Sequence, residues 1–167
     1  MIEAKAFCYG DDINTDLIYP GRYTYILMSE EEMASHALED LDPTFSKMEK
    51  GEYVIVAGKN FGCGSAREQA VKALKSKGVK AIVAKGFSRI YYRNCINEGI
   101  LPIISPEASA AAKTGDMIRI DTDQSVVLLG ERRYSFPAFP DYVKRIISAG
   151  GIIASVRQEF QKEASQS

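Results

Sequence analysis

Histidine is almost absent from this sequence, since His36 is the only one among 167 residues. A zinc site made only of protein ligands and a Ser-His-Asp triad both draw on histidine, so both are disfavoured. Cysteine is also scarce, and Cys8, Cys63 and Cys95 are odd in number and far apart. They match neither a disulfide framework nor a CxxC metal site, which favours a reducing, cytoplasmic environment.

The sequence also lacks strong net charge and long apolar runs. The formal net charge is −1, so no electrostatic argument favours nucleic acid or an anionic membrane as a partner. No stretch is apolar enough to span a bilayer, and the N-terminus lacks the apolar core of a signal peptide. The length and ordinary composition predict one domain over residues 1–167, with a polar tail at 158–167 that frays.

Apolar runs and helical periodicities divide the chain into elements. A strand at 53–57, a helix at 66–77 and a strand at 79–84 form a βαβ unit, which implies parallel strands. From residue 116 onwards, short strands separated by turn residues predict an antiparallel meander. The other strands expected are 2–8, 100–104, 117–120, 126–129 and 132–136. Short helices are expected at 89–97 and 106–112, and a final helix at 141–149. Together they predict an α/β fold with mixed parallel and antiparallel strands.

The stretch GKNFGCGSAREQ at 58–69 connects the first strand of the βαβ unit to its helix. Gly62 and Gly64 allow the backbone to turn sharply and to approach a ligand closely. The free N–H groups of a first helical turn favour negative charge, and Ser65 and Arg67 stand at that end. The pattern therefore predicts a site for a carboxylate or a phosphate.

This glycine-rich turn differs from the common nucleotide-binding loops. After Gly58 the chain does not reach the Gly-Lys-Ser or Gly-Lys-Thr of a Walker A loop. Gly62 and Gly64 fit the first half of a dinucleotide fingerprint, but Arg67 occupies the place of its third small residue. No acidic residue ends the next strand to hold a ribose.

Two simpler interpretations of the turn compete with an anion site. Ser65 and Glu68 have the spacing of a capping box, so that Ser65 would only cap the helix, and Arg67 would face solvent. Alternatively, Cys63 would be the nucleophile of a hydrolase, but it lacks a neighbouring base because the one histidine lies in another segment.

Two segments before the turn have no clear periodicity. GDDINTD at 10–16 is a polar loop, and Asp16 and Arg22 stand where an EF-hand requires glycine and glutamate, which excludes that motif. Residues 17–28 are rich in tyrosine and end in an apolar run. They form either a plug over the core or a mobile loop that closes over a ligand or docks a partner.

A helix is expected to follow Ser29, because Ser29 and Glu32 have the spacing of a capping box. Its inner face would extend to Leu41, and the proline at position 43 would end it. His36 would simply sit on this helix.

Three segments, in order, resemble one known family. NFGCGSARE at 60–68 resembles the NFGCGSSRE motif of the isopropylmalate dehydratase small subunits, which are detached swivelling domains of the aconitase superfamily. DINTD at 12–16, followed by PGR at 20–22, resembles the family's DDINTDxIIPGRY, and FSRIYYRNCIN at 87–97 resembles FARIFYRNAIN. The resemblance covers nearly the whole chain and implies a three-layer β/β/α swivelling domain.

The resemblance implies a hydro-lyase that isomerises 2-isopropylmalate and 3-isopropylmalate, in leucine biosynthesis, by dehydration and rehydration. The chain would be active only with a large subunit, in a heterodimer or heterotetramer. A 4Fe-4S cluster on that large subunit would act as Lewis acid, and this chain would bind no metal or cofactor.

The resemblance also assigns roles to residues of this sequence. Ser65, as an alkoxide, would take the C–H proton of the substrate, Arg67 would hold a substrate carboxylate, and Asp16 would face the site. The N–H donors of the turn and helix terminus would stabilise the alkoxide. The residues that would contact substrate are Gly64, Ala66, Tyr23, Thr24, Tyr25, Ile26 and Leu27.

Three departures from the family pattern affect the expected substrate. Ala66 replaces the second serine of the motif, and Gln69 replaces a common histidine. The loop at 23–27 lacks the arginine of the family's YLRT, which suits an alkyl group and argues against homoaconitate or citrate. A 2,3-dimethylmalate or methylmalate/citraconate hydro-lyase stays an alternative, as does an anion-binding module without chemistry of its own.

Overall fold

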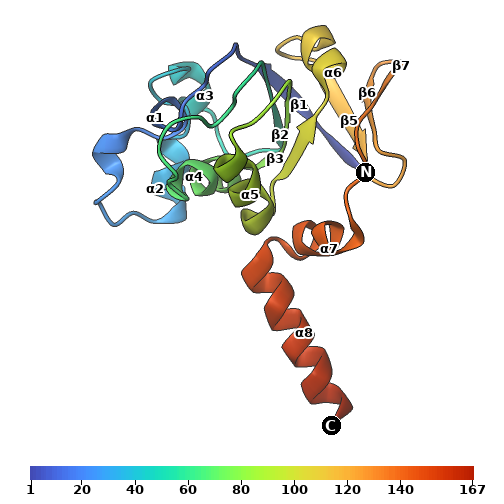
Figure 1. Cartoon of the computed structure of the whole chain (residues 1–167). Helices are drawn as coiled ribbons and strands as arrows, with labels where there is room; N and C mark the ends of the chain where they lie inside the picture. The colour runs from blue at the N-terminus through green and yellow to red at the C-terminus, as the bar shows by residue number, and fades with distance from the viewer.

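The computed structural model describes all 167 residues, which are built around one seven-stranded sheet with the order β4-β3-β2-β1-β5-β6-β7 (Figure 1). Strands β1 to β4 run parallel to one another, and β5, β6 and β7 each pair antiparallel with their neighbours, β5 with β1 and β6. This mixture confirms the prediction. The strands are β1 Ile2–Cys8, β2 Tyr53–Ala57, β3 Val79–Ala84, β4 Leu101–Ile104, β5 Met117–Asp121, β6 Val126–Leu129 and β7 Arg132–Ser135.

Eight α-helices and one short 3-10 helix accompany the sheet. The capping box of Ser29 and Glu32 is present at the start of α2, as expected. Helices α5 and α7 end at left-handed Gly99 and Gly150. The helices are α1 Thr15–Ile18, η1 Gly21–Tyr23, α2 Glu30–Ser35, α3 Pro43–Lys47, α4 Gln69–Lys77, α5 Arg89–Glu98, α6 Pro106–Ala111, α7 Asp141–Ala149 and α8 Ile152–Gln166.

Both faces of the parallel strands are covered, which explains why every residue of β2 is buried. On one face, Ile55 belongs to a core cluster shared with α1, α3, α4 and α5. On the other face, Val54 shares a cluster with Ile118 of β5 and Val127 of β6. Because β5 and β6 lie beyond β1 in the sheet, this shared cluster requires the sheet to curl over itself. The resulting layers agree with the expected β/β/α arrangement.

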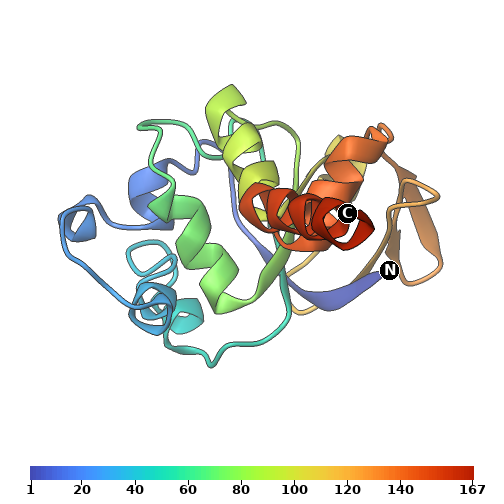
Figure 2. The ribbon, with the colours of Figure 1, turned by 90° about the horizontal axis from the view of Figure 1, so that it is seen from below.

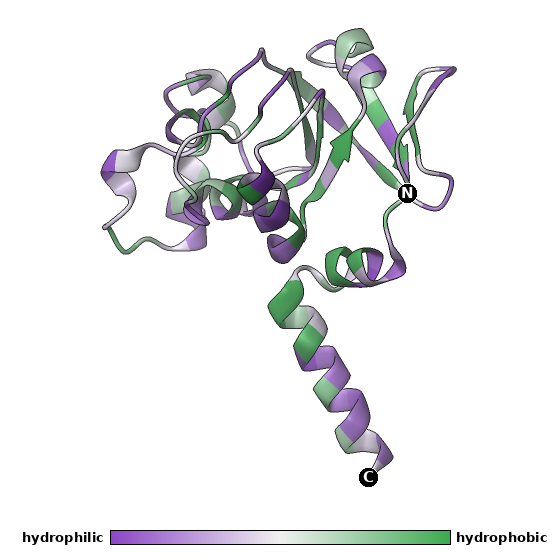
Figure 3. Cartoon of the chain, in the orientation of Figure 1, coloured by the Kyte–Doolittle hydropathy of each residue, from purple (hydrophilic) through white to green (hydrophobic).

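The C-terminal region differs from the sequence prediction. Residues 158–167, which the sequence analysis expects to fray, lie in α8, which continues as a helix to Gln166. It extends away from the rest of the chain in Figure 1, and Figure 2 views it nearly end-on. Apolar residues on α8 remain exposed, among them Ile153 and Phe160, and Figure 3 shows these alternating with polar residues along the helix. None of the helices combines the length and apolarity that a bilayer span requires.

Candidate active site

The two motif loops that follow β1 and β2 continue the pairing of these strands beyond their carboxyl ends. The N–H of Gly62 donates to the carbonyl of Ile13 at 2.8 Å, and the N–H of Thr15 donates to the carbonyl of Cys63 at 2.9 Å. The DINTD segment and the glycine-rich turn therefore lie side by side, although about 50 residues separate them in the sequence.

The third motif segment, which opens α5, is joined to the same turn by Phe61. The N–H of Phe61 donates to the carbonyl of Gly86 at 3.0 Å, and its carbonyl accepts from the N–H of Ser88 at 2.9 Å. The hydroxyl of Ser88 donates to the carbonyl of Gly62 at 2.8 Å and accepts from the N–H of Tyr91 at 3.3 Å. All three segments thus meet at the carboxyl edge of the parallel strands, where such sheets bind ligands.

Gly62 is required at the centre of this junction by both conformation and space. Its φ is +80°, and an added Cβ would lie 2.1 Å from Cγ of the buried Tyr91. We expect Gly62→Ala to lower the free energy of unfolding by about 2–4 kcal/mol, because overpacking adds to the cost of a left-handed conformation. Gly115 is the matched control, since its φ is +99° but nothing lies within 4 Å of an added Cβ. Urea denaturation of both variants measures the difference, and equal losses would contradict the steric explanation.

The structure does not use Ser65 as a helix cap. Helix α4 begins at Gln69, its N-cap is Glu68, and no side chain caps it. The capping-box interpretation is therefore wrong, as is the prediction that the helix starts at residue 66. The hydroxyl of Ser65 instead lies 3.1 Å from Oγ1 of Thr15 and accepts from Nε of Arg67 at 3.0 Å.

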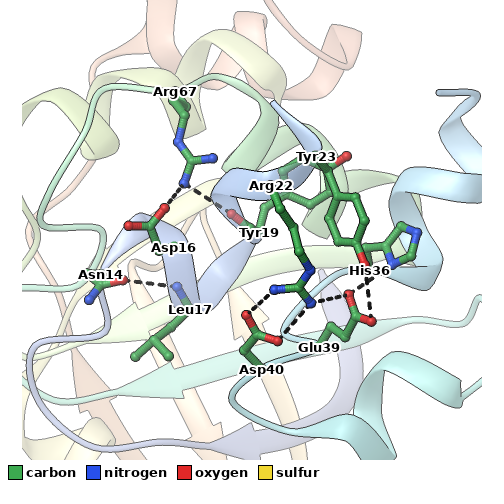
Figure 4. A network of polar contacts seen from close by, with 10 residues as sticks. All are labelled: Asn14, Asp16, Leu17, Tyr19, Arg22, Tyr23, His36, Glu39, Asp40 and Arg67. Carbon is green, nitrogen blue, oxygen red and sulfur yellow. Dashed lines mark hydrogen bonds and ion pairs between the residues drawn. The ribbon is translucent and has the colours of Figure 1, made fainter. Parts of the chain in front are cut away.

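Arg67 is not a solvent-facing helix residue either, since its side chain is only 14% exposed. Its Nη2 donates to Oδ1 of Asp16 at 2.6 Å and to the carbonyl of Tyr19 at 3.1 Å, as Figure 4 shows. Its Nη1 donates to Oγ1 of Thr24 at 2.8 Å, and its Nε donates to Ser65. Four of the five N–H groups of the guanidinium therefore donate hydrogen bonds to acceptors of this chain.

The structure brings together four of the expected site residues, namely Asp16, Thr24, Ser65 and Arg67. Gly64, with φ of +101°, and Ala66 flank Ser65 in the same non-helical stretch. The other expected loop residues, Tyr23, Tyr25, Ile26 and Leu27, line the same hollow as Ala66 and Arg67. Tyr23 also stacks on His36, and Tyr25, Ile26 and Leu27 are exposed.

Two open hollows flank the stretch that carries Ser65 and Arg67. The first, of about 680 Å³, lies between the 23–28 loop and the start of α4, and Arg67 and Ala66 line it. The second, of about 310 Å³, is lined by Gly64 and Ser65 together with the first turns of α5.

Thr15 is the site residue that the sequence analysis overlooked. It is 2% exposed, and its hydroxyl is in hydrogen-bonding contact with Ser65. The sequence offered one signal for Thr15, which is its position beside Asp16 in the DINTD motif. A polar residue that is buried next to a site loop requires a hydrogen-bonding partner. Arg89 and Asn94 of α5, which line the second hollow, were also missed.

The cysteines of this chain do not form the donor set of an iron–sulfur cluster, for which four thiolates are usual. No three His, Cys, Asp or Glu side chains are grouped closely enough to hold a metal ion. Cys95 is fully buried, which raises the pKa of its thiol, and burial also raises the pKa of the Cys8 thiol. The residues present therefore do not fit such a cluster.

The family described as the aconitase C-terminal domain matches residues 11–108, a range that holds all three motif segments. The chain therefore belongs to the aconitase C-terminal domain family. The 3-isopropylmalate dehydratase small subunit of Moorella thermoacetica is 44% identical over 164 residues, covering 96% of this chain and 98% of the relative. Within the aconitase family, this chain belongs with the 3-isopropylmalate dehydratase small subunits.

One solved structure and one curated relative from Methanocaldococcus jannaschii are also similar to this chain. A crystal structure of 3-isopropylmalate dehydratase superimposes with a TM-score of 0.89 at 38% identity, covering 99% of both chains. The methanogen homoaconitase small subunit is 43% identical over 155 residues, covering 92% of this chain and 89% of the relative. The fold is thus shared across the small subunits of more than one hydro-lyase.

Proposed function

We propose that this chain is the small subunit of a heteromeric hydro-lyase that interconverts 2-isopropylmalate and 3-isopropylmalate by dehydration and rehydration. The observation that carries the proposal is the hydroxyl of Ser65, held between Arg67 and Thr15 at the meeting point of the three motif segments. The chain would act as a single domain. A large subunit, in a heterodimer or heterotetramer, would supply the 4Fe-4S cluster and the metal chemistry.

In this proposal, Ser65 removes the proton from the substrate carbon. A serine hydroxyl is a weak acid, so its alkoxide must be stabilised by nearby donors. The guanidinium of Arg67 places a positive charge and an N–H donor 3.0 Å from Oγ, and the hydroxyl of Thr15 lies 3.1 Å from it. Both hydrogen bonds become stronger when the oxygen is negative. The start of α4, which is four residues away, contributes less than the sequence suggests.

Arg67 would also bind a substrate carboxylate. Its planar fork suits bidentate binding of a carboxylate, and Asp16 now occupies part of that fork at 2.6 Å. The side chain of Asp16 is 71% exposed, so it is the partner of Arg67 that a substrate carboxylate can most readily displace. Asp16, Thr24 and the carbonyl of Tyr19 would hold the guanidinium in place until substrate arrives.

The preference for an isopropyl substituent rests on the loop at 23–27. Tyr25, Ile26 and Leu27 offer apolar surface next to the hollow at Arg67, and the loop itself carries no cation for a further carboxylate. Lys72, the other cation that lines this hollow, lies 3.5 Å from the carboxylate of Glu68. This composition favours an alkylmalate over homoaconitate. Similar alkylmalates, such as 2,3-dimethylmalate or methylmalate, would differ from isopropylmalate in the size, number or position of their alkyl groups.

Reconstitution with the large subunit tests this function. The mixture is expected to convert 2-isopropylmalate, with the ultraviolet absorbance of the unsaturated intermediate as the signal, while neither chain alone turns over substrate. A panel of isopropylmalate, dimethylmalate, methylmalate and homoaconitate ranks the substrates. Calorimetry with simple dicarboxylates on the isolated chain addresses the anion-binding alternative. Tight binding there, with an inactive mixture, would favour a binding module over an enzyme subunit.

A further inference from the structure

The tip of the 23–28 loop has little support from the core of the protein. The side chains of Tyr25 and Leu27 are 99% and 100% exposed, and Ile26 is 54% exposed. Apolar side chains in this position gain almost no burial energy from their own chain. The position of the tip is therefore set by the residues that hold its two ends.

The N-terminal end is held through Tyr23 by the turn that follows α2. The ring of His36 stacks on the ring of Tyr23, with centroids 4.0 Å apart and an interplanar angle of 25°. Oε2 of Glu39 lies 2.9 Å from Nδ1 of His36, and Oε1 of Glu39 accepts from the Tyr23 hydroxyl at 3.4 Å. Figure 4 shows these side chains converging on the carboxylate of Glu39.

Arg22 adds a second tie between the loop and the same turn. Its Nη1 and Nη2 donate to the two carboxylate oxygens of Asp40 at 2.9 and 3.0 Å, and Nη2 lies 3.3 Å from Glu39. Its guanidinium also lies over the ring of Tyr23, 4.8 Å from the centroid. Glu39 is thus the one group in contact with Arg22, Tyr23 and His36 together.

The residues on either side of the tip are tied to the active site and to the next helix. Thr24, which follows Tyr23 directly, accepts a hydrogen bond from the guanidinium of Arg67 at 2.8 Å. At the other end, the hydroxyl of Tyr19 donates to Sδ of Met28 at 3.4 Å, and Ser29 caps α2. A shift of Tyr23 would therefore move both the apolar tip and a partner of Arg67.

We propose that Glu39 is a positioning residue that determines substrate specificity, because it fixes Tyr23 and thereby places the apolar tip against the alkyl group of the substrate. This inference rests on the proposed function. Glu39 does not touch the substrate itself, since it acts through Tyr23, His36 and Arg22.

Limited proteolysis of the full chain tests the structural half of the inference without any assay of activity. Chymotrypsin cleaves after tyrosine, leucine and phenylalanine, so Tyr25 and Leu27 report on the tip, while exposed Phe160 of α8 serves as internal reference. We expect Glu39→Ala to raise the cleavage rate at the tip about fivefold, the effect of losing a partly exposed charged contact. Cleavage after Phe160 should not change. Glu31→Ala is the matched control, because Glu31 is an exposed glutamate of α2 itself.

Kinetics of the reconstituted complex test the functional half. We expect Glu39→Ala to raise KM for 2-isopropylmalate about fivefold and to leave kcat within about twofold, because the loop acts in binding rather than in proton transfer. The preference for isopropylmalate over methylmalate should fall with it. Glu39→Gln, which still offers an acceptor to Tyr23, should recover part of both effects.

The outcomes separate the inference from the function on which it rests. If Glu39→Ala is cleaved at the tip no faster than Glu31→Ala, the contacts of Glu39 do not hold the loop, and the inference is overturned. A fall in kcat with KM unchanged overturns it too. If the wild-type complex is inactive on every alkylmalate, the proposed function fails, whereas the proteolysis result still decides whether Glu39 holds the loop.

Discussion

Ser65→Ala is expected to lower kcat of the reconstituted enzyme by about a hundredfold to ten-thousandfold, the range that general acid–base groups supply. In the proposed mechanism, the substitution removes the oxygen that would receive the proton, while Arg67 and Thr15 keep their places. The fold should tolerate it, because Ser65 does not cap α4 and its hydroxyl contacts only those two side chains. The measurement is the absorbance assay at saturating substrate, together with circular dichroism of the variant.

Variants of Thr15 show whether the loss arises from the stabilised alkoxide. Thr15→Val keeps the size of the buried side chain but removes the hydroxyl next to Ser65. We expect kcat to fall by about ten- to hundredfold, while Thr15→Ser, which keeps the hydroxyl, stays near wild type. A Ser65→Ala enzyme with wild-type turnover would show that another group takes the proton.

Arg67→Lys is expected to lower kcat/KM by about a thousandfold, although it preserves the positive charge. A lysine ammonium cannot donate simultaneously to Ser65, Thr24, Asp16 and the carbonyl of Tyr19, as the guanidinium does. It would also lose the planar fork for the substrate carboxylate. We therefore expect kcat to fall and KM to rise, which distinguishes this variant from Ser65→Ala.

Arg145→Lys is the matched control for Arg67→Lys, since Arg145 is an exposed residue of α7, remote from the turn. Its kinetics should equal those of wild type. Thermal denaturation of both variants separates lost stability from lost catalysis. If Arg67→Lys retains the wild-type KM, Arg67 does not bind the substrate carboxylate, and another cation must be sought, with Arg89 of the second hollow as the first candidate.

The meeting of the three motifs could be predicted from the sequence, because each motif follows a strand of the parallel sheet. The position of Ser65 outside the helix could not be predicted from local pattern alone. Ser65 and Glu68 match a capping box, but bonds from Thr15 and Asp16 to this stretch hold it outside the helix. Those partners lie about 50 residues earlier in the chain, where no local periodicity can reveal them.

Two other differences between the sequence prediction and the structure, at His36 and at helix α8, also arise where local patterns carry no signal. His36 is compatible with an ordinary helix position in the sequence, and only the fold shows that its ring stacks on Tyr23. Helix α8 was missed because Gly150 ends α7 and the residues that follow are largely polar. Burial gives a strong periodic signal to a core helix, and α8 lacks that signal because most of its surface faces water.

The position of β1 in the sheet means that the sheet can be completed only late in synthesis on the ribosome. β1 is the first strand to be synthesised, yet it is paired on one edge by β2 and on the other by β5. Its residue Ile2 pairs with Ile120, so one edge of this central strand stays open until most of the chain has been made. An open strand edge is a template for pairing with other chains. The nascent chain therefore carries this open edge until β5 is made, late in translation.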